Sequence, residues 1–144
     1  MLKGIDPLLD GELLRTLDQM GHGDQLVVVD SNYPAAATGR PVHRLGKVGV
    51  DEAIATILQV FPLDTFLTHP LERMEVDGNP ATTTPAHDAA LAAARSSHPN
   101  ELEWGVIPRL DFYRRAGDAY AVVHTLDPRP WGCMILHKGV IVGD

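Results

Sequence analysis

The residue with the most versatile chemistry in this sequence is a histidine between two glycines. His22 stands in the segment Met20-Gly-His-Gly-Asp24, after an expected helix and before an apolar run. Histidine titrates near neutral pH and can give or take a proton, and the partial negative charge at a helix end favours its cationic form. Flanking glycines let the backbone approach a ligand closely. The same pattern also fits a turn, in which Gly21 is a left-handed helix stop and His22 a surface residue.

A carboxylate follows the apolar run. Asp30 comes directly after residues 26–29, a continuous Leu-Val-Val-Val segment that predicts a buried strand. Ligands of open α/β sheets gather beyond the carboxyl ends of the strands, which favours a ligand-binding role for Asp30. The alternative is a simple turn, because Asp-Ser-Asn is ordinary loop chemistry.

The C-terminal third holds further candidates. Arg109 precedes an expected short helix, and its guanidinium could bind ligand oxygens or form an ion pair with Asp111 or Glu103. The segment Trp131-Gly132-Cys133 follows a proline turn, and its indole could face a ligand or cover the sheet edge. Nothing near Cys133 lowers the pKa of its thiol, so the sequence favours no catalytic thiol. Two tyrosines could stack on a ligand or belong to the core: Tyr113 and Tyr120.

Interleaved helices and strands must position these residues. Capping and periodicity signals predict helices over residues 10–20, with Asp10 as the cap, over 51–61, with Asp51 as the cap, and over 85–95 and 110–116. Apolar runs predict strands over residues 26–29, 42–45, 66–76, 102–107, 119–125 and 133–136, with 140–142 continuing the last strand or forming another. The pattern predicts an α/β fold, with helices on both faces of a mostly parallel or mixed sheet.

Composition narrows the classes of protein. The 144 residues favour a single domain over 1–144, and the formal charge of −7 argues against nucleic-acid or anionic-membrane partners. The single cysteine, with neither a signal peptide nor a membrane span in the sequence, predicts a cytoplasmic protein. No nucleotide-binding loop, zinc-protease motif or nucleophile elbow is present, and the histidines form no pair at helical metal spacing. The sequence therefore gives no positive support for a metal site.

Several segments together resemble one known family. These are MLKGIDPLL, ELLRTLDQMGHGDQLVVVD, NYPA, FYRRAGDAYAVVHT and WGCMILHKGV. They resemble the RbsD/FucU family of D-ribose pyranases and L-fucose mutarotases over nearly the whole chain. The likeness is strongest over residues 1–36 and 105–140 and loose over 62–104. GHGD and the arginine before the Phe-Tyr helix are typical of the fucose branch.

The resemblance implies an RbsD-like three-layer αβα fold and a cofactor-free isomerase that interconverts the α and β anomers of L-fucose or a related monosaccharide. His22 matches the family's catalytic histidine, and Asp30 and Arg109 match its sugar-binding residues. The resemblance also implies a ring-like homo-oligomer with the site near a subunit boundary. Two alternatives stay open: a D-ribose pyranase-type isomerase, and a non-catalytic sugar-binding accessory to transport. Whether Asp30 holds the sugar or orients the imidazole of His22 also stays open.

One stretch departs from the family pattern. Trp131, Gly132 and Cys133 match substrate-binding positions that usually read Tyr-Gly-Asn. The tyrosine hydroxyl and the asparagine amide are both lost, whereas backbone contacts survive the changes. Because a site that hydrogen-bonds a particular hydroxyl discriminates strongly, the departure predicts an altered sugar preference.

Overall fold

Six strands form one sheet at the centre of the molecule, and the computed structural model describes residues 1–144. The strands are β1 (Gln25–Val29), β2 (Val42–Gly46), β3 (Leu71–Met74), β4 (Gly105–Ile107), β5 (Ala121–Thr125) and β6 (Cys133–His137). Their order across the sheet is β2-β5-β1-β6-β3-β4. Only β6 runs against the others, since it pairs antiparallel with both β1 and β3 while the remaining pairs are parallel. The predicted mostly parallel or mixed sheet is confirmed.

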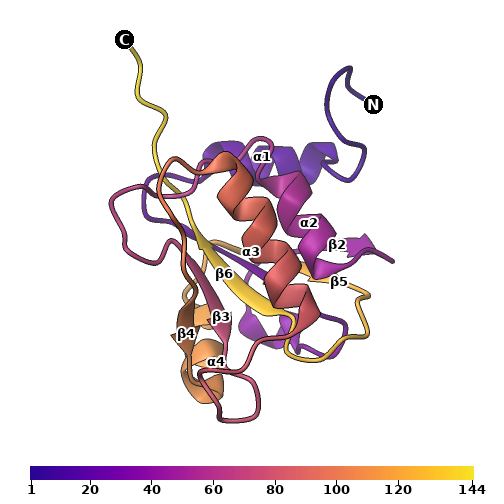
Figure 1. Ribbon diagram of the computed structural model, residues 1–144. Coiled ribbons are helices and arrows are strands. Elements are labelled where there is room, and N and C mark those ends of the chain that lie inside the picture. Colours follow the sequence, from indigo (N-terminus) through magenta and orange to yellow (C-terminus); the bar gives the residue numbers. More distant parts are fainter.

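Helices cover both faces of this sheet (Figure 1). They are α1 (Gly11–Gln19), α2 (Val50–Ile57), α3 (Pro85–Ser97) and α4 (Arg109–Gly117), with a short 3-10 helix at Ala35–Thr38. Helices α1, α2 and α3 pack in one apolar cluster, and α4 packs with the 3-10 helix in a second cluster on the opposite face. The result is the expected three-layer αβα arrangement. None of these helices is both long enough and apolar enough to cross a membrane.

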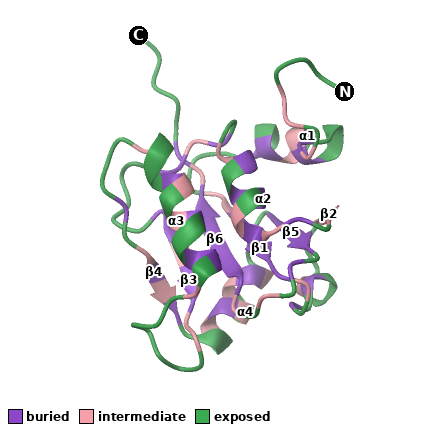
Figure 2. Ribbon diagram, turned by 45° about the vertical axis from the view of Figure 1, so that its right-hand side comes forward, coloured by how far each residue is buried: buried purple, intermediate pink, exposed green.

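Strand β1 joins the two clusters. Alternate side chains of a strand point to opposite faces, so Leu26 and Val28 belong to the first cluster while Val27 and Val29 belong to the second. All four are fully buried, as Figure 2 shows for the middle of the sheet. A strand covered on both faces needs apolar residues at every position, which explains the unbroken run seen in the sequence.

The helix ends confirm one expected cap and correct two expectations. Asp10 caps α1 by accepting a hydrogen bond from the amide of Leu13 at 2.8 Å, as predicted. Asp51 does not cap α2: the helix starts after Gly49, and the carboxylate of Asp127 accepts the amide of Val50 from across the fold. The left-handed glycine after α1 is Gly23 rather than the expected Gly21, since α1 ends through an extended Met20.

The expected strand over residues 140–142 is wrong. After β6, the amide of Gly139 donates to the carbonyl of Pro62, and the chain then leaves the body of the molecule (Figure 1). No strand of this chain lies beside the tail, so its backbone has no ladder to join. The side chains of Ile141 and Val142 are consequently more than four-fifths exposed.

Candidate active site

One edge of the sheet gathers most of the residues expected to bind a ligand. Because β1, β3 and β4 run in the same direction, their carboxyl ends meet there, and β6, which runs the other way, begins there. A pocket of about 230 Å³ opens at this edge. The expected residues that line it are Asp30, Arg109, Trp131 and Cys133, together with Tyr113. Sequence reasoning missed Tyr33 and Met74, which also line it.

Asp30 lies at the base of this pocket and is only 3% exposed. One carboxylate oxygen accepts the amide of Asn32 at 2.9 Å, which is the turn expected for Asp-Ser-Asn. The other accepts the amide of Gly132 at 3.0 Å and the thiol of Cys133 at 3.6 Å. Asp30 therefore ties the start of β6 to the end of β1 while facing the pocket, so the turn and ligand interpretations are compatible.

The pocket holds a neutral thiol. Burial raises the pKa of Cys133 well above its usual value, and the negative charge of Asp30 raises it further. Since the thiolate is the nucleophilic form, this environment opposes thiol catalysis, in agreement with the sequence analysis. Cys133 instead serves as a small buried donor to Asp30.

Aromatic side chains form one wall of the pocket. The rings of Tyr33 and Tyr113 stack with centroids 5.3 Å apart, and the ring of Phe112 meets Tyr33 edge-on. The buried hydroxyl of Tyr33 has no hydrogen-bond partner, and burial raises the pKa of Tyr33 above its usual value. A buried hydroxyl without a partner is unusual in a folded protein, so Tyr33 is a distinctive residue of this wall.

Arg109 stands at the mouth of the pocket on the first turn of α4. Its guanidinium carbon lies 5.7 Å from the centroid of the Tyr113 ring. The alternative ion pairs are not formed, because Asp111 pairs with Arg114 and Glu103 pairs with Arg95. The donors of Arg109 are thus left for a ligand.

His22 forms a second polar group with a residue that the sequence analysis missed. Its Nε2 lies 3.0 Å from a carboxylate oxygen of Asp64, which is 3% exposed. The other oxygen of Asp64 accepts the amide of Phe66, and the backbone amide of Asp64 donates to the carbonyl of His137. Asp64 lies 42 residues from His22 in sequence, so local spacing carried no signal for the pair.

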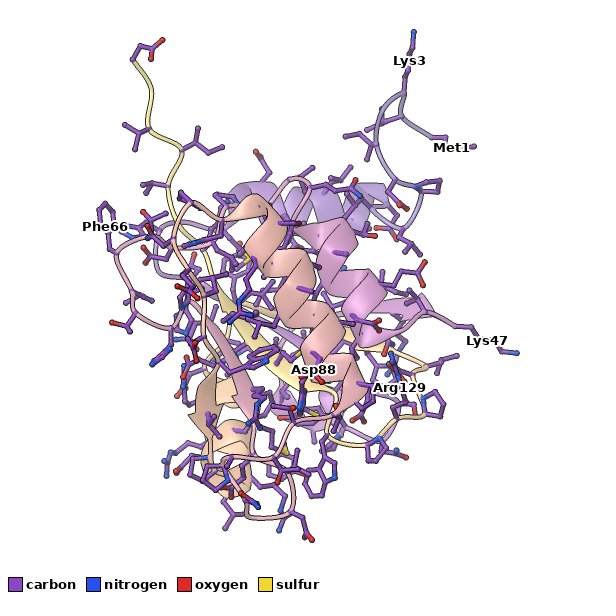
Figure 3. The ribbon with its side chains drawn as sticks, in the orientation of Figure 1. Met1, Lys3, Lys47, Phe66, Asp88 and Arg129 are labelled. Atoms are coloured by element: carbon purple, nitrogen blue, oxygen red, sulfur yellow. The ribbon has the colours of Figure 1, made fainter.

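This pair leaves one imidazole nitrogen free. A carboxylate accepts hydrogen bonds, so Nε2 of His22 carries the hydrogen and Nδ1 keeps a lone pair in the neutral ring. The His22 side chain is 46% exposed, and its ring lies 5.6 Å from that of Phe66, which stands out from the surface in Figure 3. At the end of α1, the ammonium of Lys138 binds the carbonyls of Leu17 and Met20.

His22 and the pocket lie at opposite ends of β1. The histidine precedes the strand and Asp30 follows it, and the five strand residues alone span roughly 16 Å. Asp30 therefore does not orient the imidazole of His22 in the same chain. The carboxylate that does so is Asp64. No group of three or more His, Cys, Asp or Glu side chains is arranged to hold a metal ion.

Comparisons with known proteins agree with one another. Residues 3–141 match the RbsD / FucU transport protein family. An L-fucose mutarotase of Haemophilus influenzae is 35% identical over 140 residues, which cover 97% of each chain. FucU from Bifidobacterium longum superposes with a TM-score of 0.90 at 36% identity, covering 97% of this chain and all of that one. The fucose mutarotase of Streptococcus pneumoniae, solved in complex with L-fucose, superposes with a TM-score of 0.86 at 33% identity, covering 98% of this chain and all of that one.

Proposed function

The chain belongs to the RbsD/FucU family, and we propose that it is a mutarotase that interconverts the α and β anomers of L-fucose or a closely related monosaccharide. The observation that carries the proposal is the pocket, where a buried carboxylate, an unpaired guanidinium and aromatic side chains line one cavity. These groups suit the several hydroxyls of a monosaccharide. Relatives named for L-fucose, one of them with the sugar bound, identify the sugar class.

Mutarotation needs proton transfer and no covalent intermediate. The anomeric hydroxyl loses its proton, the bond between the anomeric carbon and the ring oxygen breaks, and that oxygen gains a proton. The free aldehyde then rotates, and the reverse steps close the ring on its other face. One histidine can serve as base and then as acid, because its two forms are both populated near neutral pH.

We assign this proton exchange to Nδ1 of His22, with Asp64 as its positioning residue. The hydrogen bond from Nε2 to Asp64 holds one tautomer and stabilises the cation that forms during the transfer. Asp30 and Arg109 hold the sugar, and the aromatic side chains of Tyr33, Tyr113 and Trp131 flank it. General acid–base help of this kind contributes about 10²–10⁴-fold.

We further propose that a second copy of the chain completes the site. His22 and the pocket lie at opposite ends of β1, so His22 of one copy would reach the pocket of the next. Such a head-to-tail contact generates a ring when the rotation closes. Exposed apolar side chains at both ends support it: Phe66 lies beside His22 and is followed by Leu67, and Leu110 follows Arg109.

The proposal also includes a single domain over residues 1–144 and a cytoplasmic location. All six strands join one sheet, which supports a single domain over residues 1–144. Cys133 is a free buried thiol, as is common in the reducing cytoplasm.

Two-dimensional exchange NMR on equilibrated L-fucose and on D-ribose tests the function. The wild-type protein should speed exchange between L-fucose anomers, and His22→Ala should leave only the rate of the buffer. A ribose preference would instead favour the pyranase alternative. Saturable sugar binding without any rate effect would make the protein a sugar-binding accessory and refute the catalytic proposal.

A further inference from the structure

Trp131 adopts a backbone conformation that large residues avoid. Its φ is +66°, and Asp77 is the one other non-glycine residue with positive φ. The left-handed region is strained for a bulky side chain, and such strain persists only where surrounding contacts impose it. Trp131 also lines the pocket. Whatever imposes its conformation therefore shapes the proposed sugar site.

A buried histidine of α3 supplies one such contact. Nε2 of His87 donates to the carbonyl of Trp131 at 2.7 Å, and His87 is fully buried. Its Nδ1 accepts the amide of Thr84 at 3.1 Å, which fixes the tautomer that donates from Nε2. Burial lowers the pKa of His87, which keeps the ring in this neutral form.

The same peptide unit is held from its other side. The Trp131 carbonyl and the Gly132 amide belong to one peptide plane, and that amide donates to Asp30 at 3.0 Å. A Cβ on Gly132 would lie 3.2–3.3 Å from Val50 and Asp30, so this plane fits closely between its neighbours. A continuous chain of hydrogen bonds thus runs from His87 through one peptide to the pocket carboxylate.

We infer that His87 is a positioning residue of the sugar pocket. It orients the Trp131–Gly132 peptide, and through it the indole of Trp131 and the carboxylate of Asp30. His87 does not line the pocket and transfers no proton to the sugar. This inference rests on the proposed function for its effect on sugar turnover, whereas its effect on the peptide is independent of any sugar.

Two substitutions of similar shape test the two hydrogen bonds of His87 separately. The amide nitrogen of Gln reaches the position of Nε2, so His87→Gln keeps a donor to the Trp131 carbonyl. The amide oxygen of Asn lies near the position of Nδ1, so His87→Asn keeps the acceptor for Thr84 and loses that donor. Loss of one hydrogen bond should raise KM for L-fucose about fivefold in His87→Asn, with kcat nearly unchanged. His87→Gln should stay near the wild-type values.

Ala92→Gly is the control for general weakening of α3. Ala92 is exposed in the middle of this helix, so glycine there lowers the melting temperature without touching Trp131. It should leave KM unchanged. Equal losses in both His87 variants, or a KM change in Ala92→Gly as large as in His87→Asn, would overturn the inference.

Backbone NMR gives a readout without sugar. The amide of Gly132 and the indole NH of Trp131 should shift in His87→Asn and hardly move in His87→Gln. Glycine adopts positive φ without strain, so adding Trp131→Gly should recover part of the stability lost in His87→Asn. A double variant no more stable than His87→Asn alone contradicts the inference. If the wild-type protein fails to speed anomer exchange, the proposed function is lost, and the Gly132 signals still decide the role of His87.

Discussion

The imidazole of His22 lies 3.0 Å from the carboxylate of Asp64, while Asp30 lies beyond the far end of the strand that follows His22. The acid–base group and the pocket carboxylate thus face different ends of the sheet in one chain. Asp64 is itself held by the amide of Phe66 and the carbonyl of His137. The pair is therefore built on the body of the fold rather than on a free loop.

Asp64→Asn should slow catalysis without weakening sugar binding. The amide can no longer stabilise the imidazolium or select one tautomer, so kcat should fall about 10- to 100-fold with KM little changed. Exchange NMR over a range of L-fucose concentrations measures both constants. Asp18→Asn, on the exposed side of α1, is the matched control. A KM effect without a kcat effect would instead make Asp64 a sugar ligand.

Two inactive variants should restore activity when mixed. His22→Ala and Arg109→Ala each remove one half of the proposed shared site, and both residues are exposed, so folding should be preserved. In randomly reassembled 1:1 rings, about a quarter of the sites would combine an intact His22 with an intact Arg109. Mixing after partial denaturation, with light scattering to confirm the oligomer, tests this. A site contained in one chain predicts no recovery at all.

The fold should lose stability in acid through Glu72. Burial alone would raise the pKa of Glu72, but hydrogen bonds from Arg115 and His137 outweigh it and lower the pKa to about 2. A carboxyl whose folded pKa lies below its unfolded value of 4.5 stabilises the fold above that value. This stabilisation disappears as the pH falls from about 4.5 towards 2.

Glu72→Gln measures that contribution. At pH 7 the variant should have a free energy of unfolding about 2–3 kcal/mol below the wild type, and the gap should narrow through the acid range. Urea unfolding at several pH values gives both curves. Glu101→Gln changes an exposed residue and should leave the free energy of unfolding at each pH as in the wild type. If the stability difference between the wild type and Glu72→Gln did not vary with pH, the acid sensitivity could not be assigned to Glu72.

Cys133 should resist thiol reagents in the folded protein. It is 4% exposed and burial raises its pKa, so both access and thiolate content are low. A chromogenic disulfide reagent at pH 8 should react only as fast as the protein unfolds, and denaturant should release one thiol per chain. Rapid labelling of the native protein, with loss of activity, would contradict this prediction and make Cys133 a candidate for a reactive thiol.

Local patterns in the sequence were enough to predict the layers and to place Asp30 at the sheet edge, whereas the other predicted site residues were expected there only from the family resemblance. An unbroken apolar run must be buried on both sides, which identified the central strand, and a polar residue after that strand must lie at the sheet edge. Caps formed by near neighbours, such as Asp10, could be predicted. The cap supplied to α2 by Asp127 could not, because it comes from 77 residues away.

The sequence by itself determined the α/β class, the central strand β1, and His22 and Asp30 as polar groups at its two ends. Only the tertiary structure paired His22 with Asp64, separated His22 from the pocket, and brought His87 into hydrogen-bond contact with the left-handed Trp131. The reason is physical: strand and helix periods are set by neighbouring residues, whereas these contacts join segments more than 40 residues apart. Their geometry exists only once both faces of the sheet have packed.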